Sequence, residues 1–446
     1  MAEQTRPHVV HWIEYLMQRI DSREAQVAVI GLGYVGLPLA VEFARAGLRV
    51  TGIDVAVEKI ESLNASRSYI TDITGAELGP LVAAGLLRAT DDYSVLADMD
   101  AAIICVPTPL SKSRDPDISY IVQSADQIVR FAHPGMVVVL ESTTYPGTTE
   151  ELLLSRFETA GYTVGEDFFL AFSPERIDPA NPVFGVRNTP KVIGGMTPNC
   201  TRVSIALYEC AVDQLVPVSN PGSAEMVKLL ENTFRAVNIG LVNEMAIICD
   251  KLDIDIWEVI GAASTKPYGF MPFYPGPGLG GHCLPIDPLY LSWRLRALHY
   301  STRFIELADN INSNMPRHVV EKITDALNAH RKPINGSRLL VLGVAYKPNV
   351  GDIRESPAFE VIEQLLHKGG LVSYHDPFVP LLKNENFALQ SVELTPEALG
   401  QADCVVVITN HEVFDWTWVA EHATLIMDTR NALGRVESPK AEVVRL

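Results

Sequence analysis

A cysteine and an aspartate four residues apart, Cys283 and Asp287, are the side chains of this chain best suited to covalent chemistry. They lie in residues 280–288, Gly-Gly-His-Cys-Leu-Pro-Ile-Asp-Pro, directly after a Pro-Gly-Pro-Gly run at 275–278. Glycine and proline at this density predict a loop rather than a helix or strand. A thiolate there could attack a carbonyl carbon, with the carboxylate beside it. The alternative is a small buried cysteine, with Asp287 as a plain N-cap and Pro288 as the first helical residue.

A glycine-rich segment near the start of the chain predicts a dinucleotide site. The apolar run 27–30 is followed by Gly-Leu-Gly-Tyr-Val-Gly, a helical pattern, a second apolar run and Asp54. Gly31 permits a tight turn, Gly33 lets the backbone approach a pyrophosphate, and Gly36 lets the helix pack on the strand. Asp54 lies where a carboxylate accepts from a ribose hydroxyl and repels a 2′-phosphate, which favours NAD over NADP. The residues that we expect to contact the cofactor here are Gly31, Gly33, Tyr34, Val35, Gly36 and Asp54.

Length and charge limit the classes of function. A chain of 446 residues is too long for one ordinary core, so two or three domains are expected. Hydrophobic residues make up 47% and charged residues 20%, as in a globular protein. The net charge of −18 makes nucleic acid and anionic membranes poor partners, so an anionic substrate needs a local positive pocket.

The cysteines and the N-terminus predict a cytoplasmic protein. The six cysteines are scattered without metal-type spacing, so we expect no metal site and a reducing compartment. Cys105, Cys249 and Cys404 lie in apolar contexts that predict inert packing. No apolar run approaches the roughly 18 residues that span a bilayer. Residues 9–20 form an amphipathic helical pattern, not a signal peptide, which we expect to pack on the body of the protein or on a partner subunit.

The order of apolar runs predicts two doubly wound α/β domains, Rossmann-like, joined by a long helix. We expect a helical extension over 1–24, an NAD-binding domain over 25–205, a central helical domain with the cysteine loop over 206–332, and a second Rossmann-like domain over 333–446 that binds the UDP-sugar. The strands expected in the first sheet include 101–105, 136–140 and 168–172. Ligands lie past the carboxyl ends of such strands, so the loops 106–109, 141–147 and 173–176 should face cofactor and substrate.

The central region contains a long helical pattern over 224–252, whose only glycine is Gly240. Lys228 and Asn232 are four residues apart and share one face of it. A lysine on such a helix is usually solvated, and Glu225 or Glu231 could pair with it. A long helix between domains is also a common dimer surface.

The last region predicts a second parallel sheet, with strands at 338–343, 371–374, 404–409 and 425–427. It has no G-x-G-x-x-G, so no second dinucleotide is expected there. Lys347 and Arg354 lie on loops and could hold the phosphates of a nucleotide. The alternative is that Arg354 pairs with Asp352 or Glu355. Ser356-Pro357 predicts a helix N-terminus.

These motifs together resemble the UDP-glucose/GDP-mannose dehydrogenase family over nearly the whole chain from Val27. The resemblance rests on four ordered motifs: the glycine fingerprint, the helix with Lys228 and Asn232, the cysteine loop, and the segment 346–357. Within the family, His282 before the cysteine and the segments 142–148 and 173–179 are most similar to the branch acting on UDP-N-acetylhexosamines, above all the UDP-N-acetylglucosamine 6-dehydrogenases. Ala180 departs from the glycine expected there, which leaves the gluco and manno epimers open. The first 24 residues lie outside the resemblance.

The resemblance implies a four-electron oxidation of the sugar C6 alcohol to a carboxylate, with two NAD⁺ and one water. Cys283 would trap the aldehyde as a thiohemiacetal that becomes a thioester. Lys228 and Asn232 would stabilise oxyanions, Asp287 would act on the hydrolytic water, and Glu175 would be or orient a general base through a water that Thr143 also holds. Cofactor contacts would also come from Pro107, Thr108, Thr143 and Arg354. Substrate contacts would come from Glu175, Arg176, Lys228, Asn232, Phe273, Tyr274, Gly280 and Lys347.

Several alternatives stay open at this point. UDP-N-acetylmannosamine or UDP-glucose could be the substrate instead. Two-electron 3-hydroxyacid and 6-phosphogluconate dehydrogenases also combine a dinucleotide domain with long helices, but need neither a cysteine loop nor a second alternating domain. A non-enzymatic alternative is a redox-sensing nucleotide-binding protein with Cys283 as its switch. Phe273 and Tyr274 could be core aromatics. A homodimer or higher homo-oligomer is expected. The expected product is a uronic acid for surface polysaccharide.

Overall fold

The computed structural model describes residues 11–70, 73–111, 115–178, 181 and 183–446. It forms two compact units, divided between Leu230 and Glu231 inside one long helix. The start of the predicted N-terminal helix and Ala180, which bears on the epimer, lie outside the described residues.

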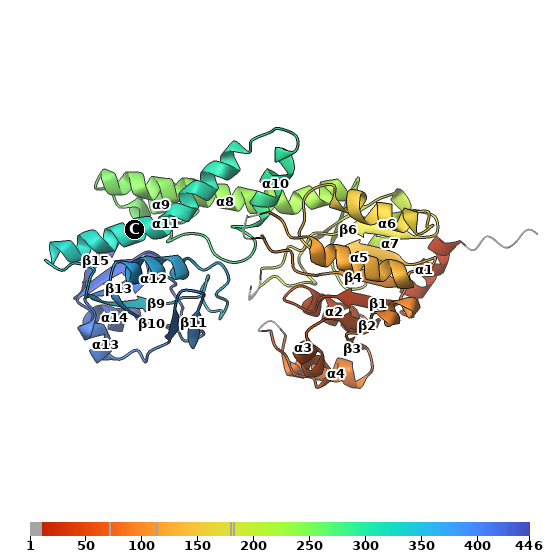
Figure 1. The fold of residues 1–446 in the computed structure, drawn as a ribbon, viewed down its shortest axis with the longest axis horizontal. Coiled ribbons are helices and arrows are strands. Elements are labelled where there is room, and N and C mark those ends of the chain that lie inside the picture. Colours follow the sequence, from red (N-terminus) through yellow and green to blue (C-terminus); the bar gives the residue numbers. More distant parts are fainter. Residues whose placement is uncertain (1–10, 71–72, 112–114, 179–180, 182) are drawn as a thin grey trace, which may run out of the picture. The chain divides into compact units, whose positions relative to one another are not determined.

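The N-terminal unit is built on an eight-stranded sheet with the order β3-β2-β1-β4-β5-β6-β7-β8 (Figure 1). Its strands are β1 (Gln26–Ile30), β2 (Arg49–Ile53), β3 (Leu87–Thr90), β4 (Ala101–Ile104), β5 (Val137–Leu140), β6 (Phe169–Phe172), β7 (Lys191–Gly195) and β8 (Leu215–Val218). Its helices are α1 (Trp12–Asp21), α2 (Gly36–Arg45), α3 (Val57–Asn64), α4 (Gly75–Ala83), η1 (Tyr93–Asp98), α5 (Ser119–Phe131), η2 (Thr149–Leu154), α6 (Ser155–Thr159) and α7 (Pro198–Glu209).

This sheet is parallel except at one junction. Neighbouring strands from β3 to β6 run parallel, whereas β7 is antiparallel to β6. A parallel return needs a crossover, usually a helix. The connection 173–190 carries several prolines and forms no helix over its described residues, so the chain turns back instead. The predicted doubly wound sheet is confirmed, with this reversal at its far edge.

Both faces of the sheet are covered because its strands are apolar on both sides. Val27 and Val29 of β1 pack in one core with α1, α2 and α7, while Ala28 and Ile30 pack in the other with α5 and α6. Because β1, β4, β5 and β6 run parallel between these two layers, their carboxyl ends lie along one edge of the sheet.

Helix α1 packs on the body of its own unit, as one of the two predicted arrangements has it. Leu16 and Ile20 are fully buried in the core that contains β1. Arg19 Nε donates to Asp100 Oδ1 at 2.7 Å, which fixes the helix beside the start of β4.

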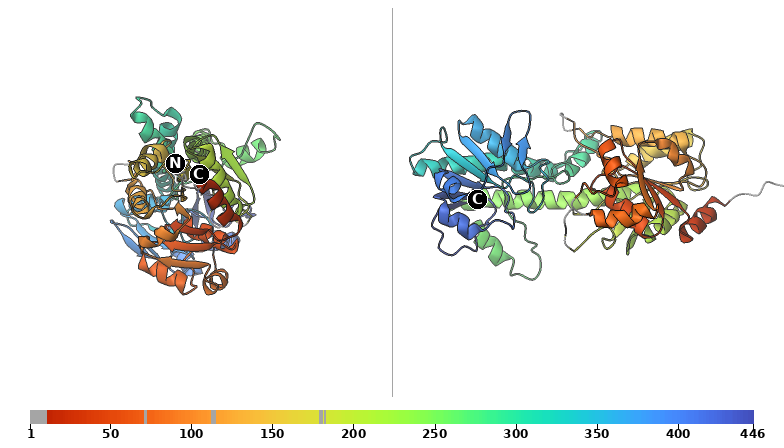
Figure 2. Two further views of the ribbon diagram at one scale, coloured as in Figure 1. Left: turned by 90° about the vertical axis from the view of Figure 1, so that its right-hand side faces the viewer. Right: turned by 90° about the horizontal axis from the view of Figure 1, so that it is seen from below.

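The two units share helix α8 (Pro221–Lys251), which is drawn in light green and is continuous in Figure 1 and in the right view of Figure 2. The predicted long helix is confirmed and begins three residues earlier than the pattern 224–252, because Pro221 is accepted in a first helical turn. The following helices are α9 (Ile256–Ala263), α10 (Asp287–Arg296) and α11 (Arg303–Ala329). None of the helices within the described ranges is long and apolar enough to cross a membrane.

The C-terminal unit contains a second sheet, fully parallel, with the order β10-β9-β13-β14-β15. Its strands are β9 (Arg338–Leu342), β10 (Leu371–His375), β13 (Cys404–Val407), β14 (Leu425–Asp428) and β15 (Glu442–Arg445), beside a hairpin of β11 (Leu381–Lys383) and β12 (Ala388–Gln390). Helices α11 and α12 (Pro357–His367) cover one face, and α13 (Pro396–Gln401) and α14 (Trp416–His422) the other. Ser356 caps α12 as predicted, since its side chain accepts from Ala358 N.

The predicted fold class is therefore confirmed: two Rossmann-like α/β regions linked by one long helix. The finer domain boundaries at 24/25, 205/206 and 332/333 stay predictions.

Candidate active site

The glycine loop after β1 has the backbone geometry that a dinucleotide site requires. Gly31 has φ of +94°, and a Cβ at Gly36 would lie 1.8 Å from Gly31 O, so neither position accepts a side chain. A Cβ at Gly33 would meet nothing within 4 Å, so the outer side of the loop is open to a ligand. Val35 is the N-cap of α2, whose first amides point toward the same loop. These features fit a bound pyrophosphate.

Asp54, at the end of β2, is a buried carboxylate held in one orientation. Its Oδ2 accepts from Leu32 N at 2.8 Å and from Lys59 Nζ at 2.9 Å, and its Oδ1 accepts from Ala56 N at 2.9 Å. Burial alone would raise the pKa of Asp54, but these donors outweigh it and hold the pKa below its ordinary value. Each carboxylate oxygen accepts two hydrogen bonds, so Oδ1 keeps a position that a ribose hydroxyl would fill.

The other predicted cofactor residues follow the neighbouring strands. Tyr34 is half-buried in the glycine loop, and Pro107 (exposed) and Thr108 (half-buried) follow β4. Thr143 follows β5. Because β1, β4 and β5 are adjacent and parallel, these loops lie along one edge of the sheet.

Lys228 and Thr143, two predicted site residues far apart in sequence, are in contact. Lys228 is buried, 7% exposed, and its Nζ donates to Thr143 Oγ1 at 2.5 Å. The alternative of a solvated lysine is therefore wrong. Pairing with Glu225 is also wrong, because that carboxylate accepts from Gly147 N, Thr149 N and Thr149 Oγ1 instead.

Glu175, after β6, has both oxygens directed by the protein. Its Oε1 accepts from the amides of Arg176 and Ile177 at 2.7 and 2.5 Å. Its Oε2 lies 3.8 Å from the Nζ of Lys191. Arg176 is half-buried, and its guanidinium donates to Pro190 O at 2.6 Å.

A buried charge cluster that sequence reasoning missed lies behind Glu175. Lys191 Nζ donates to Glu141 Oε2 at 2.9 Å, and Tyr208 donates to the other oxygen of Glu141. Burial raises the pKa of Glu141, whereas for Lys191 the two carboxylates Glu141 and Glu175 outweigh burial and raise the pKa. The sequence did contain a signal for this cluster. Glu141 and Lys191 each border an apolar strand, where a charged side chain is removed from solvent and needs a partner.

In the C-terminal unit, Asp287 contacts Asn232 rather than capping a helix. Helix α10 begins at Asp287, with Ile286 as its N-cap, so the predicted N-cap role is wrong. The turn starts earlier because Ile286 N and Asp287 N both donate to Cys283 O, at 3.1 and 2.8 Å. The Asp287 carboxylate accepts from Asn232 Nδ2 at 2.6 Å. Cys283 is half-buried and is in no disulfide.

The cysteine loop rests on the segment after β9. A Cβ at Gly280 would lie 2.6 Å from Tyr346 Cβ, and Gly281, at φ of +78°, donates its amide to Arg354 O at 2.9 Å. Lys347, half-buried, lies one residue after Tyr346. The cysteine loop and the segment 346–357, which were predicted as separate motifs, are thus in contact.

Arg354 forms the ion pair that the sequence left as an alternative. Its Nε donates to both oxygens of Asp352 at 3.0 Å, and its Nη2 donates to Oδ2 at 2.5 Å. Burial would raise the pKa of Asp352, but the Arg354 guanidinium and amide hold it below its ordinary value. A contact from Arg354 to the cofactor stays a prediction.

The two aromatics before the loop differ in their surroundings. Phe273 is half-buried and packs on an apolar cluster of α8 and α9, with its ring 5.7 Å from that of Phe234. Tyr274 is exposed and stacks on Trp257 at 6.2 Å between ring centroids. The core alternative is therefore wrong for Tyr274, whereas Phe273 contacts this cluster but remains partly exposed.

Comparison with known protein families matches three consecutive segments of the chain to the UDP-glucose/GDP-mannose dehydrogenase family. The NAD binding domain of that family matches residues 25–212, its central domain 222–314 and its UDP binding domain 340–435.

Individual relatives differ in the sugar that their names give. The NDP-N-acetyl-D-galactosaminuronic acid dehydrogenase of Ralstonia nicotianae is 35% identical over 409 residues, 89% of this chain and 93% of that protein. The UDP-N-acetyl-D-glucosamine 6-dehydrogenase of Pseudomonas aeruginosa is 34% identical over 397 residues, 88% and 92%. The solved structure of a UDP-D-ManNAc dehydrogenase from Pyrococcus horikoshii is similar with a TM-score of 0.85, 32% identity, and coverage of 94% and 98%.

Asp54→Asn is expected to weaken NAD⁺ binding about tenfold or more, because the amide nitrogen cannot accept and a hydrogen bond to a charged group contributes about 1.5–3 kcal/mol. Binding of UDP should not change. Calorimetric titration with NAD⁺ and with UDP separately measures both. Lys59→Met is the matched control, since it removes one donor but keeps the carboxylate. Equal losses for both ligands would show that Asp54 acts only structurally.

Lys191→Met is expected to lower the free energy of unfolding by about 3–5 kcal/mol, because Glu141 and Glu175 are then buried without their cation. Chemical denaturation measures the loss. Lys191→Arg keeps the charge and should recover a substantial part of it. A loss below about 1 kcal/mol in the methionine variant would contradict the role of this pair.

Proposed function

Since the chain belongs to the UDP-glucose/GDP-mannose dehydrogenase family and is an NAD-dependent UDP-sugar dehydrogenase, we propose that it oxidises C6 of UDP-N-acetylglucosamine to the uronic acid. The observation that carries the reaction is the cysteine loop. A half-buried thiol at Cys283 lies one turn before the buried carboxylate of Asp287, which Asn232 orients.

The proposed reaction converts an alcohol into a carboxylate in two oxidations and one hydrolysis. When bound, NAD⁺ accepts the hydride in each oxidation. The alcohol first loses a proton and a hydride to give the aldehyde. The Cys283 thiol gives up its proton, its sulfur adds to the aldehyde carbon, and the aldehyde oxygen takes up a proton to give the thiohemiacetal. Loss of that proton and of a second hydride then gives a thioester. Water then cleaves the C–S bond, releasing the carboxylate and restoring the thiol.

Lys228 is the proposed electrostatic partner of the developing oxyanions. Its buried ammonium is oriented by Thr143, and a fixed cation in a site shielded from water stabilises negative charge far more than one in solvent. Asn232 lies one helical turn further along α8, on the same face.

The proton transfers are assigned to two carboxylates. Asp287 is proposed to hold and activate the hydrolytic water, since the hydrogen bond from Asn232 orients its carboxylate at the start of α10. Glu175 is proposed as the general base of the first oxidation, directly or through a water, because two amides and Lys191 orient its carboxylate.

The nucleotide end of the substrate is assigned to the C-terminal unit. Residues 340–435 match the family's UDP binding domain, and Lys347 lies within them on the loop after β9. We assign Lys347 to the diphosphate and Arg354 to the cofactor. Arg176, Phe273, Tyr274 and Gly280 complete the proposed substrate contacts.

The choice of sugar rests on His282, which resembles the UDP-N-acetylhexosamine branch, and on the segments 142–148 and 173–179, which resemble the UDP-N-acetylglucosamine 6-dehydrogenases. Relatives named for N-acetylmannosamine and N-acetylgalactosaminuronic acid are equally similar over the chain, so UDP-N-acetylmannosamine is the second candidate. The product would be a precursor of surface polysaccharide. With every cysteine free of disulfides, a reducing cytoplasm is the proposed compartment.

Helix α8 supports a homodimer. Its exposed apolar side chains recur at spacings of three, four or seven residues, which places them in one stripe along the helix. They are Met226, Leu230, Phe234, Leu241, Met245 and Ile248. Lys228 and Asn232 are buried and lie outside this stripe. We propose that helix α8 of a second copy of the chain covers this stripe.

With UDP-N-acetylglucosamine, two NADH per sugar consumed are expected, because the aldehyde stays bound through Cys283 and is oxidised again. NADH absorbance and chromatography of the nucleotide sugars measure the ratio. One NADH per sugar would contradict the covalent route. Turnover with UDP-N-acetylmannosamine and none with UDP-N-acetylglucosamine would show that the manno epimer is the substrate.

Cys283→Ser is expected to abolish formation of the acid while NAD⁺ binding remains, since an alkoxide at this position forms an ester too poorly activated for hydrolysis. Product analysis and NAD⁺ titration measure the two effects. Cys249→Ser, in a buried cysteine of α8, is the matched control. Unchanged ligand affinity on mild oxidation would contradict the redox-switch alternative.

Leu241→Glu is expected to convert the dimer into a monomer, because a charge in the apolar stripe cannot be desolvated. Sedimentation velocity measures the mass. Leu371→Glu changes a leucine that is as exposed but lies on β10, and should leave the mass unchanged. A monomeric wild-type protein would refute the dimer.

A further inference from the structure

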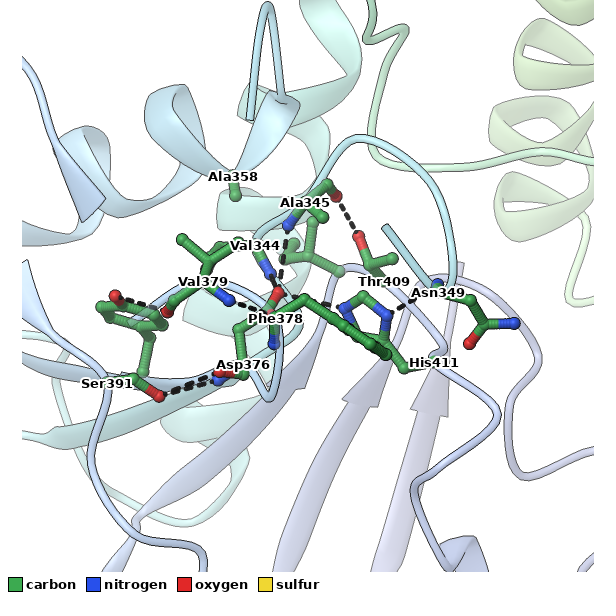
Figure 3. Close-up of polar contacts among 12 residues, drawn as sticks. Val344, Ala345, Asn349, Ala358, Asp376, Phe378, Val379, Ser391, Thr409 and His411 are labelled. Atoms are coloured by element: carbon green, nitrogen blue, oxygen red, sulfur yellow. Dashed lines mark hydrogen bonds and ion pairs between the residues drawn. The ribbon is translucent and has the colours of Figure 1, made fainter. Parts of the chain in front are cut away.

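A buried aspartate–histidine pair lies in the C-terminal unit, outside the proposed catalytic residues (Figure 3). Asp376 follows β10 and His411 follows β13, and both side chains are fully buried. Asp376 Oδ1 accepts from the amides of Phe378 and Val379 at 2.8 and 3.1 Å. His411 Nε2 lies 3.0 Å from Asp376 Oδ2. A buried pair of this kind requires an explanation, because burying polar groups costs free energy.

The hydrogen bonds fix the protonation of the histidine. The amide of Asn349 donates to His411 Nδ1 at 2.9 Å, and a backbone amide is always a donor. Nδ1 therefore carries no proton, so Nε2 carries it and donates to Asp376. Burial alone would raise the pKa of Asp376, but His411 and the amides of Val344 and Phe378 hold it below its ordinary value. The imidazole thus acts as a fixed acceptor toward one loop.

The same pair holds that loop, residues 343–349, at both ends. At its start, Asp376 Oδ2 accepts from the amides of Val344 and Ala345 at 2.7 and 3.2 Å, and Thr409 Oγ1 donates to Ala345 O at 2.6 Å. At its end, His411 accepts from Asn349, whose backbone adopts φ of +63°. Between these fixed ends lie three residues, Tyr346, Lys347 and Pro348.

We propose that the Asp376–His411 pair is a positioning device for the nucleotide-sugar, which fixes the loop 343–349 so that Lys347 meets the diphosphate. The inference rests on the proposed role of Lys347 and adds two residues to it. An amide of the loop that lost its acceptor would turn toward water, and Lys347 would sample other positions. The binding of UDP would weaken, while the binding of NAD⁺, whose proposed contacts lie in the other unit apart from Arg354 outside this loop, would not.

Two substitutions of His411 separate the acceptor from its partner. In His411→Asn the side-chain oxygen lies where Nδ1 lay and still accepts from Asn349. In His411→Gln the amide nitrogen takes the place of Nε2 and donates to Asp376, but the acceptor for Asn349 is lost. The Kd for UDP, measured by calorimetric titration, is expected to rise about tenfold in the glutamine variant and less than about threefold in the asparagine variant. The Kd for NAD⁺ should stay unchanged in both.

A matched control tests whether the loss is merely structural. Val419→Ala opens a cavity in α14 of the same unit and should lower the Tm without changing the Kd for UDP. Equal Kd values for UDP in the asparagine and glutamine variants would overturn the proposal. A rise of the same size in the Val419 variant would overturn it as well.

Lys347→Met distinguishes this proposal from the proposed function. When the lysine is absent, adding His411→Gln should raise the Kd for UDP by less than about twofold, because the pair acts through Lys347. If Lys347→Met alone leaves the Kd unchanged, the assignment of Lys347 fails and the positioning role falls with it. If Lys347→Met weakens UDP binding but His411→Gln does not, the positioning role alone is overturned.

Discussion

The hydrogen bond from Asn232 to Asp287 ties the cysteine loop to helix α8. Glycine and proline supply few side-chain contacts, so this segment depends on hydrogen bonds such as this one. The loop is held on its other side by backbone, through Gly281 N to Arg354 O and the close approach of Gly280 to Tyr346. Three segments that are distant in sequence are therefore fixed around one thiol, which is what preorganisation of a nucleophile requires.

In the N-terminal unit, buried charges orient the proposed site residues. Its parallel strands deliver Thr143 and Glu175 to one edge, and buried cations hold each of them: Lys228 donates to Thr143, and Lys191 lies beside Glu175. Desolvated charges are costly, so each buried cation lies beside polar or anionic groups. Lys191 is balanced by Glu141, which Tyr208 also contacts. The stability of this unit and the orientation of its proposed base thus depend on the same few contacts.

In the C-terminal unit, a neutral imidazole and a carboxylate orient a loop. Its loop after β9 has one tightly packed glycine, Gly343, in place of the glycine fingerprint. Asp376 and His411 supply fixed acceptors to its amides instead. A pair of buried side chains from β10 and β13 can do this because both strands flank β9 in the sheet.

Much of the molecule could be predicted from the sequence by itself, because local pattern decides local structure. The strand runs, Gly31–Gly36, Ser356-Pro357 and the long helix of α8 appear as predicted, since each depends on residues close together in the chain. The family follows from motifs in fixed order for the same reason. Only the tertiary structure decided which side chains meet. Lys228 donates to Thr143 rather than facing water, Asp287 accepts from Asn232 instead of capping α10, and Lys191 and His411 are buried against carboxylates. These pairs join residues from separate strands and helices, and the free energy of burying a charge depends on neighbours that no local spacing specifies.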